Sequence, residues 1–168
     1  MLLVSVRRAT LADLPTVTDI LSEAASWLEQ QHMTLWEKHE VNPQALRKDV
    51  ESGLFHIAFH NGTSAGVVKF QTEDVLFWPD IPHNDSAFIH RLAVRRSFAG
   101  GSISTALLKW AVEQGRKLDK RYLRLDCAID RSRLRLIYEK FGFRHHSDKQ
   151  VGSYLVARYE YKLFRGVR

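Results

Sequence analysis

The loop AGGSIS, residues 99–104, has the residue types of an anion-binding turn. It follows an apolar run at residues 87–94 and precedes a run with helical periodicity that begins near residue 102. Backbone N–H groups at a strand-to-helix junction point outward with the positive end of the helix dipole, and small residues let a phosphate approach closely. The loop has neither the G-x-G-x-x-G nor the Walker A spacing. Taken alone, it predicts either a pyrophosphate-binding turn or a plain connection.

Composition limits the class of protein. The chain has 168 residues, 45% of them apolar, and a formal net charge of +6. We therefore expect one folded domain over residues 1–168, with a basic excess that suits nucleic acid, a membrane surface or a polyphosphorylated small molecule. No apolar run approaches the roughly 20 residues of a bilayer span, and the N-terminal residues lack a signal peptide's apolar stretch. These features predict a cytoplasmic protein without a membrane partner.

Metal and nucleic-acid sites are not expected. Cys127 is the only cysteine, which excludes an internal disulfide and a cysteine-based zinc site. The histidines form no H-x-x-x-H pair on an expected helix, so we expect no metal. The basic run at residues 115–125 fits a solvated helix end that leads into a strand. No aromatic-basic interleaving or recognition helix supports a nucleic-acid partner.

Hydrophobic periodicity predicts the elements that must position these residues. The expected order is β α α β β β α β α β. Expected strands cover residues 2–9, 54–60, 63–71, 87–94, 122–129 and 152–164, with a short additional strand near 143–145, and expected helices begin near residues 10–13, 42, 102 and 132. Asn42 and Pro43 suit a helix start, and Asn61-Gly62 suits a tight hairpin turn. The pattern predicts a mixed α/β fold whose second half contains parallel strands joined by helices.

Two blocks of the sequence resemble the GNAT superfamily of acyl-CoA-dependent N-acyltransferases. Leu92-Ala93-Val94 fits the strand end of the family's core signature, and Ala106-Leu107-Leu108 fits the helix that follows. Residues 123–143 are similar to a later strand and helix of the family, including its Tyr-x-x-x-Gly-Phe ending at residues 138–143. Serine replaces the usual small residues at positions 102 and 104, and Arg131 stands where the family often has asparagine.

The resemblance implies a fold and a co-substrate. The fold would be a mixed, mostly antiparallel central sheet of about six to seven strands flanked by helices, with a splayed parallel pair that binds CoA. Acetyl-CoA would lie in that splay, and no metal is implied. Its pantetheine arm would pair with the backbone of the strand end, and its pyrophosphate would bind the loop and nearby arginines. The implied cofactor-binding residues are Leu92, Ala93, Val94, Ala99, Gly100, Gly101, Ser102, Ile103, Ser104 and Arg131.

The resemblance also implies two roles in proton transfer. Tyr138 would give a proton to the departing sulfur, because the family often places a tyrosine there. A base must take a proton from the attacking amine. Phe88, His90, Leu92 and Val94 share one strand face unless a bulge intervenes, so His90 would face the cleft, and an ordinary histidine titrates near neutral pH. Asp85, Glu73 and a water chain are alternatives to His90 as the base.

The acceptor would be a primary amine of a small molecule or peptide. Trp27 and Trp36 resemble residues of the family's first helices that cover the acceptor, and Trp78 would add a wall. The long last strand is expected to be a sheet edge, which could pair across a homodimer. The alternative to an active enzyme is a GNAT-fold module that binds CoA or a partner without turnover, because serine occupies two signature positions of the loop.

Overall fold

The computed structural model describes residues 3–33 and 35–164. The chain folds into two compact units. Unit 1 contains the chain up to Phe70 and Arg91–Trp110, and unit 2 contains Gln71–His90 and the chain from Ala111 onward. Strand β4 (Ser86–Val94) and helix α3 (Ile103–Lys117) belong partly to each unit. Because each unit combines separate stretches of chain, neither is a contiguous sequence domain, and the single domain over 1–168 stays a prediction.

Seven strands form one sheet in the order β1-β2-β3-β4-β5-β7-β6. The other strands are β1 (Val4–Arg8), β2 (Phe55–His60), β3 (Thr63–Gln71), β5 (Tyr122–Ala128), β6 (Arg144–Val151) and β7 (Tyr154–Lys162). Neighbours β1–β2, β2–β3, β5–β7 and β6–β7 are antiparallel, and β4–β5 is parallel. The predicted mixed, mostly antiparallel sheet with a parallel pair is therefore confirmed.

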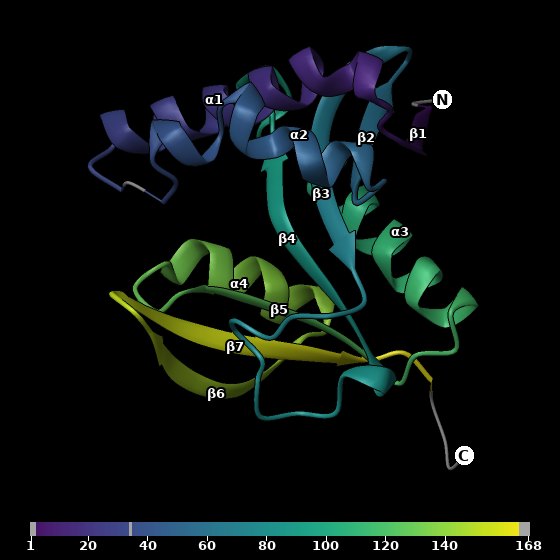
Figure 1. Ribbon diagram of the computed structural model, residues 1–168, viewed down its shortest axis with the longest axis vertical. Helices are drawn as coiled ribbons and strands as arrows, with labels where there is room; N and C mark the ends of the chain where they lie inside the picture. The colour runs from purple at the N-terminus through teal and green to yellow at the C-terminus, as the bar shows by residue number, and fades with distance from the viewer. Residues whose placement is uncertain (1–2, 34, 165–168) are drawn as a thin grey trace. The chain divides into compact units, whose positions relative to one another are not determined.

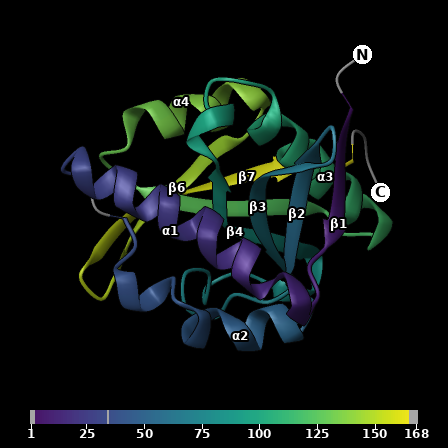
Figure 2. The same cartoon turned by 90° about the horizontal axis from the view of Figure 1, so that it is seen from above.

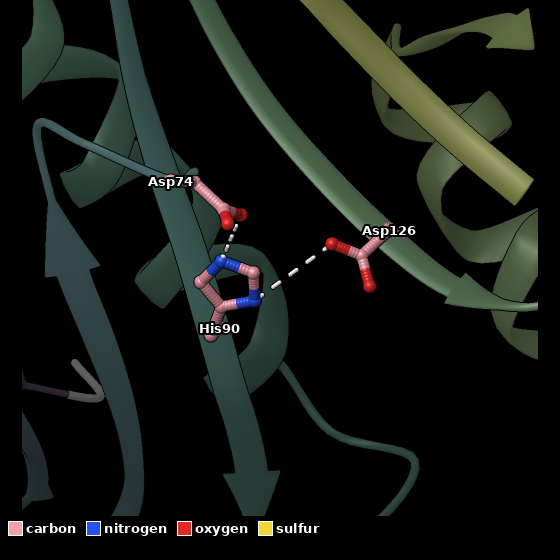
Figure 3. Close-up of side chains that lie close together, drawn as sticks. All are labelled: Asp74, His90 and Asp126. Atoms are coloured by element: carbon pink, nitrogen blue, oxygen red, sulfur yellow. Dashed lines mark hydrogen bonds and ion pairs between the residues drawn. The ribbon is translucent and has the colours of Figure 1, made fainter. Parts of the chain in front are cut away.

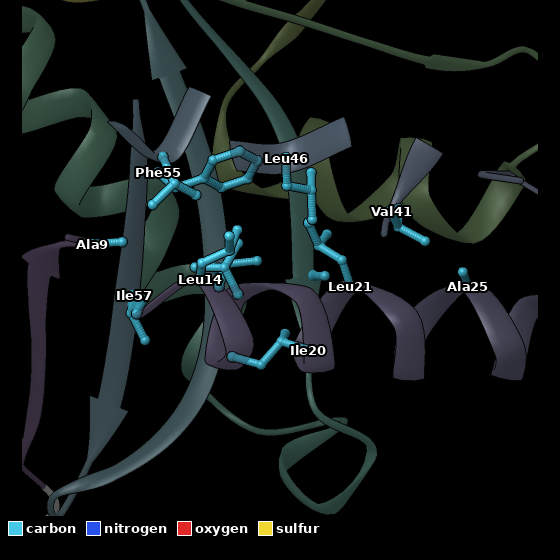
Figure 4. Packing of buried hydrophobic residues seen from close by; sticks show 13 residues of the cluster. Ala9, Leu14, Ile20, Leu21, Ala25, Val41, Leu46, Phe55 and Ile57 are labelled. Atoms are coloured by element: carbon cyan, nitrogen blue, oxygen red, sulfur yellow. The ribbon is translucent and has the colours of Figure 1, made fainter. Parts of the chain in front are cut away.

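In unit 1, helices α1 (Leu14–Gln30) and α2 (Pro43–Glu51) cover one face of the sheet (Figure 2). Pro15 lies in the first turn of α1, and the Asn42 side chain accepts a hydrogen bond from the Ala45 amide at 2.8 Å, as the capping pattern predicted. The apolar stripe of α1 packs with α2, β2 and β3 (Figure 4). Burial of this stripe holds the helices on the sheet, because removing apolar surface from water is the main stabilising contribution.

The β2–β3 hairpin turns at Asn61-Gly62, as predicted. Both residues have positive φ, 49° and 83°, which is what a two-residue turn of this kind requires. The opposite sheet face of unit 1 contacts the first part of α3 through Trp110, whose ring lies 4.2 Å from the His56 ring and 5.6 Å from the Phe70 ring, centroid to centroid. Helices therefore lie on both faces of the strands in this unit.

In unit 2, helix α4 (Ser132–Phe141) packs against β7, since the Tyr138 and Tyr159 rings are 6.3 Å apart (Figure 1). The helix ends at Gly142, whose φ of 123° suits glycine, as the sequence predicted. Strand β6 has eight residues, much longer than the short strand expected near residues 143–145. Its side chains are largely exposed and polar, so no apolar alternation marked its full length.

The expectation that the last strand is a sheet edge was wrong. Strand β7 lies between β5 and β6, and the edges are β1 and β6. Both sides of β7 are already hydrogen-bonded, so it offers no free edge for a second copy of the chain. The basis for a homodimer through this strand is thereby removed. No helix among the described residues is both long and apolar enough to cross a membrane.

Candidate active site

Strands β4 and β5 pair over a short stretch only. The described register runs from Ser86 opposite Tyr122 to Phe88 opposite Arg124, whereas β5 stays paired with β7 as far as Ala128. Two residues beyond the last parallel pair, β4 carries His90 and β5 carries Asp126. An extension of the same register would place these two residues side by side on one face of the strands, and their side chains do lie close together, with His90 Nδ1 3.8 Å from Asp126 Oδ2.

A backbone irregularity follows His90 directly. Arg91 has φ of 54°, an uncommon value for a residue with a β-carbon in the middle of a strand. An irregularity of this kind interrupts the alternation of side chains, and it lies between His90 and Leu92. A shared face for Phe88, His90, Leu92 and Val94 was expected only without such an irregularity, and the positive φ of Arg91 meets that exception.

His90 lies between two carboxylates in unit 2 (Figure 3). Its Nε2 is 2.7 Å from Asp74 Oδ2, a hydrogen bond, and its Nδ1 is 3.8 Å from Asp126 Oδ2. The His90 side chain is 17% exposed, and those of Asp74 and Asp126 are 4% and 9% exposed. Ligand atoms of the three residues lie within 4.8 Å of one another, a spacing compatible with a metal ion, which the sequence did not lead us to expect.

The segment from Asp74 to Asp80 holds the Asp74 carboxylate in place. Asp74 Oδ1 accepts a hydrogen bond from the Phe77 amide at 3.0 Å, and the Asp74 carbonyl accepts one from the Trp78 amide at 3.2 Å. Asp80 forms a two-pronged ion pair with Arg158, at 2.6 and 3.0 Å. These bonds fasten the segment over the sheet, so that Asp74 is directed at His90.

Trp78 does not line an open surface. Its side chain is 0% exposed, and its ring is flanked by the guanidinium carbons of Arg124 at 5.3 Å and Arg158 at 4.6 Å. A ring with no exposed surface offers none to a ligand, so the expectation of an acceptor-binding role for Trp78 is corrected. Its position indicates that it anchors the Asp74–Asp80 segment instead.

The two carboxyl groups beside His90 have opposite pKa shifts. Burial of Asp74 opposes ionisation, but the hydrogen bond and charge of His90 and the amides of Phe77 and Leu76 outweigh it and lower the Asp74 pKa. Burial raises the pKa of Asp126 to about 6, opposed by the charge of His90 and reinforced by that of Asp74. Asp74 is thus the carboxylate that stays ionised, and it accepts the Nε2–H of His90.

Asp85 and Glu73 are the two carboxylates that were considered as alternatives to His90 for the general base. Asp85 accepts a hydrogen bond from the Ser86 hydroxyl at 2.7 Å and lies 3.4 Å from Arg124 Nη1. Glu73 is exposed, and its carbonyl accepts a hydrogen bond from the Gln71 side chain. Among the described residues, His90 therefore combines burial with a bonded carboxylate, which neither alternative does.

Tyr138 is a buried tyrosine with its proton retained. It is 5% exposed, and its ring lies 5.9 Å from that of Phe143. Burial raises the Tyr138 pKa well above its usual value, and the nearby Cys127 and Asp126 act in the same direction. Burial also raises the pKa of Cys127 to about 12, which agrees with an unreactive core thiol. A neutral tyrosine hydroxyl can donate a proton or a hydrogen bond.

The loop at residues 99–104 lies in unit 1, before the first turn of α3. Gly100 has φ of 76°, and a β-carbon there would meet no atom within 4 Å, so the backbone is openly accessible at this point. Ala99 and Gly101 are not free to bind an anion through their amides, because these donate to the carbonyls of Arg96 at 3.1 Å and Phe98 at 3.2 Å. The amides of Ile103, Ser104 and Thr105, at the start of α3, precede the first bond of the helix, which the Ala106 amide donates to the Ser102 carbonyl at 2.9 Å, and amides in this position suit a phosphate.

The arginines that the sequence suggested for phosphate binding at the 99–104 loop make different contacts. Arg95 is paired with Asp19 at 2.5 Å and bonded to the Ser64 carbonyl at 2.9 Å, so it acts as a clamp within unit 1. The Arg96 guanidinium carbon lies 3.8 Å from the centre of the Trp27 ring. Arg131, in unit 2, occupies the residue just before α4.

A hollow of about 600 Å³ lies in unit 1 between α1 and the segment that leads to α2. Trp36 lines it together with the acidic residues Glu29 and Glu37, whereas Trp27 is not among its lining residues. The Arg91 guanidinium carbon also lies 5.2 Å from the centre of the Trp36 ring. Lys38 and His39 line the hollow as well, so its lining carries both signs of charge.

Comparison with known proteins identifies the class. The sequence pattern of the acetyltransferase (GNAT) family matches residues 17–143, so the chain belongs to this family and is an acetyltransferase of the GNAT type. It is 27% identical over 158 residues to the uncharacterized N-acetyltransferase YesJ of Bacillus subtilis (strain 168), covering 88% of this chain and 85% of the relative.

Solved structures agree on the fold. A GNAT-family acetyltransferase from Listeria monocytogenes 4b F2365 has a TM-score of 0.79 at 23% identity, covering 95% of this chain and 94% of that one. The yncA protein from Salmonella typhimurium, solved with its cofactor acetyl-CoA, has a TM-score of 0.73 at 16% identity, covering 99% of this chain and 97% of that one. The predicted GNAT fold is confirmed.

Proposed function

We propose that this protein transfers the acetyl group of acetyl-CoA to the primary amine of a small molecule or peptide, by direct attack of the amine on the thioester. The observation that supports this most is the hydrogen bond between His90 and Asp74 at the point where β4 leaves β5. A histidine held by an ionised carboxylate is a general base of the kind that amine deprotonation needs.

Within unit 1, we assign cofactor binding to the backbone of Leu92, Ala93 and Val94 and to the first turn of α3. The open backbone at Gly100 and the helix start at Ile103 support this assignment, and Ser102 and Ser104 add hydroxyl groups there. In unit 2, Arg131 adds a positive charge at the start of α4. Acetyl-CoA, when bound, supplies the activated acetyl group.

The proton-transfer residues are assigned within unit 2. Asp74 accepts the Nε2–H of His90, which leaves the Nδ1 lone pair to take a proton from the amine. Tyr138, kept neutral by burial, is assigned as the donor to the leaving sulfur. Trp27 and Trp36 are kept as acceptor-binding residues, and Trp36 lines the hollow in unit 1.

Calorimetry with acetyl-CoA and CoA, followed by an amine panel monitored for free thiol, tests this proposal. We expect both ligands to bind and at least one amine to release thiol. His90→Gln should abolish thiol release while leaving acetyl-CoA affinity unchanged. His145→Gln is the matched control, because His145 is also bonded to an aspartate, Asp148 at 2.7 Å, but is exposed.

Three results would contradict parts of the proposal. Absence of acetyl-CoA binding would remove the transferase assignment. Binding of acetyl-CoA without turnover on the whole panel would favour the alternative, a CoA-binding module without catalysis. If His90→Gln and His145→Gln lose turnover equally, His90 has no specific role as the base.

A further inference from the structure

Asp126 carries a buried oxygen that lacks a hydrogen-bond partner. Its side chain is 9% exposed, and Oδ2 has no hydrogen-bond donor within reach among the described residues. Buried carboxylate oxygens are nearly always bonded, because their desolvation is costly otherwise. An oxygen of this kind can accept a hydrogen bond from a bound group.

This oxygen points at His90, not at a cation (Figure 3). Asp126 Oδ2 lies 3.8 Å from His90 Nδ1, which is too long for a hydrogen bond. In the neutral form of His90, which is the form that can act as a base, Nε2–H is donated to Asp74 and Nδ1 presents a lone pair, so two acceptors then face each other across the gap. Two facing acceptors require a donor between or beside them.

The cationic side chain next to Asp126 is that of Arg158, and its guanidinium group is already hydrogen-bonded to other groups. Arg158 stands opposite Asp126 in the β5–β7 register. Its guanidinium donates to Asp80, to the Phe77 carbonyl at 3.1 Å and to the Ser147 hydroxyl at 2.8 Å. Arg158 therefore fastens the covering segment and does not supply a donor to Asp126 Oδ2.

We propose that Asp126 is the counter-ion that binds the acceptor amine as its ammonium form, with the N–H groups of the ammonium donating to Asp126 Oδ2 and His90 Nδ1. The substrate class is then a primary alkylammonium without a carboxylate close to the amine, since a second anion would be repelled by Asp126 and Asp74. This inference rests on the proposed function, and it assigns to that site a residue and a charge requirement that the transferase assignment does not include.

The number of protons that the acceptor nitrogen loses in the reaction agrees with the presence of two proton acceptors, His90 Nδ1 and Asp126 Oδ2. An ammonium nitrogen has three N–H bonds and the amide product has one, so two protons leave the nitrogen while a C–N bond forms and a C–S bond breaks. His90 Nδ1 takes the proton that frees the lone pair for attack, and Asp126 Oδ2 takes the one lost after the C–N bond has formed. The sulfur gains one proton from Tyr138, Tyr138 is reprotonated by one of the two, and the other passes to water.

The test uses the whole protein with ¹⁵N-labelled histidine rings, n-butylammonium chloride as probe and n-butanol as its neutral counterpart. The His90 signals are identified by their loss in His90→Gln. We expect butylammonium to shift them in the wild type, butanol to leave them unchanged, and Asp126→Asn to weaken the butylammonium response by about tenfold or more. Asp126→Glu, which keeps the charge, should retain part of the response, and Glu113→Gln on the exposed side of α3 should match the wild type.

Several outcomes would overturn the inference. These are an equal shift with butanol, an equal response in Asp126→Asn, or a shift caused by zinc chloride alone and reversed by EDTA, which would make the cluster a metal site. If Asp126→Asn does not fold, the comparison of butylammonium with butanol on the wild type still decides. Acetyl-CoA calorimetry on the same sample shows separately whether the transferase assignment has failed.

Discussion

The buried carboxyl of Asp126 should make the protein less stable as its side chain ionises, and Asp126→Asn should remove that penalty. The Asp126 pKa is about 6 in the folded state and near 3.9 in an unfolded chain, a difference of about two pH units. Each unit corresponds to about 1.4 kcal/mol, so the folded state loses about 3 kcal/mol once the group is ionised in both states. The side chain is 9% exposed, so solvent screening reduces this little.

The direction of the pH dependence follows from the raised pKa. Well below a pH of about 4 the carboxyl is protonated in both states and costs nothing, whereas well above about 6 the full penalty applies. At about pH 5 roughly half of it remains, so the stability advantage of Asp126→Asn should grow by about 1.3 kcal/mol between about pH 5 and about pH 7.5.

Urea unfolding of both proteins across this range measures the difference in the free energy of unfolding. Glu113→Gln, which removes one exposed carboxylate, is the control and should show no comparable pH dependence. An advantage that is absent, or that shrinks as the pH rises, would refute the view that Asp126 is held in the fold against its own ionisation. If the Asp126→Asn protein is more stable, as expected, and also less active, the result would indicate that the carboxyl group of Asp126 is kept for function at a cost in stability.

Three further changes test other parts of the structure. Gly66→Ala should destabilise the protein by about 2 kcal/mol or more in urea unfolding, because the added β-carbon would lie 2.8 Å from the Ala93 carbonyl oxygen; a neutral result would show that β3 and β4 can separate there. Asp80→Asn should cost about 1–2 kcal/mol and lower turnover, since it leaves the buried Arg158 guanidinium without its ion pair, and unchanged turnover would contradict the anchoring role of this segment. Tyr138→Phe should lower kcat about 100-fold with acetyl-CoA affinity unchanged, and intact kcat would remove Tyr138 from the donor role.

Local chemistry made most of the elements predictable. The Asn42 cap, the Asn61-Gly62 turn and the Gly142 stop each depend on bonds or backbone angles within a few residues, and all three were confirmed. Strand β6 was the exception, because its exposed, polar side chains give no alternating pattern. The place of β7 inside the sheet depends on which strands pair, and periodicity within one strand carries no information about its neighbours.

The sequence by itself determined the family, the order of elements and His90 as a candidate base, because motifs and periodicity are properties of neighbouring residues. Tertiary structure alone brought Asp74 and Asp126, which are 52 positions apart in the sequence, to the two sides of the His90 ring. It also placed Trp78 under Arg124 and Arg158 and so turned an expected ligand contact into an anchor. Burial and pairing decide these roles, since both depend on which distant segments meet and neither is fixed by residue type alone.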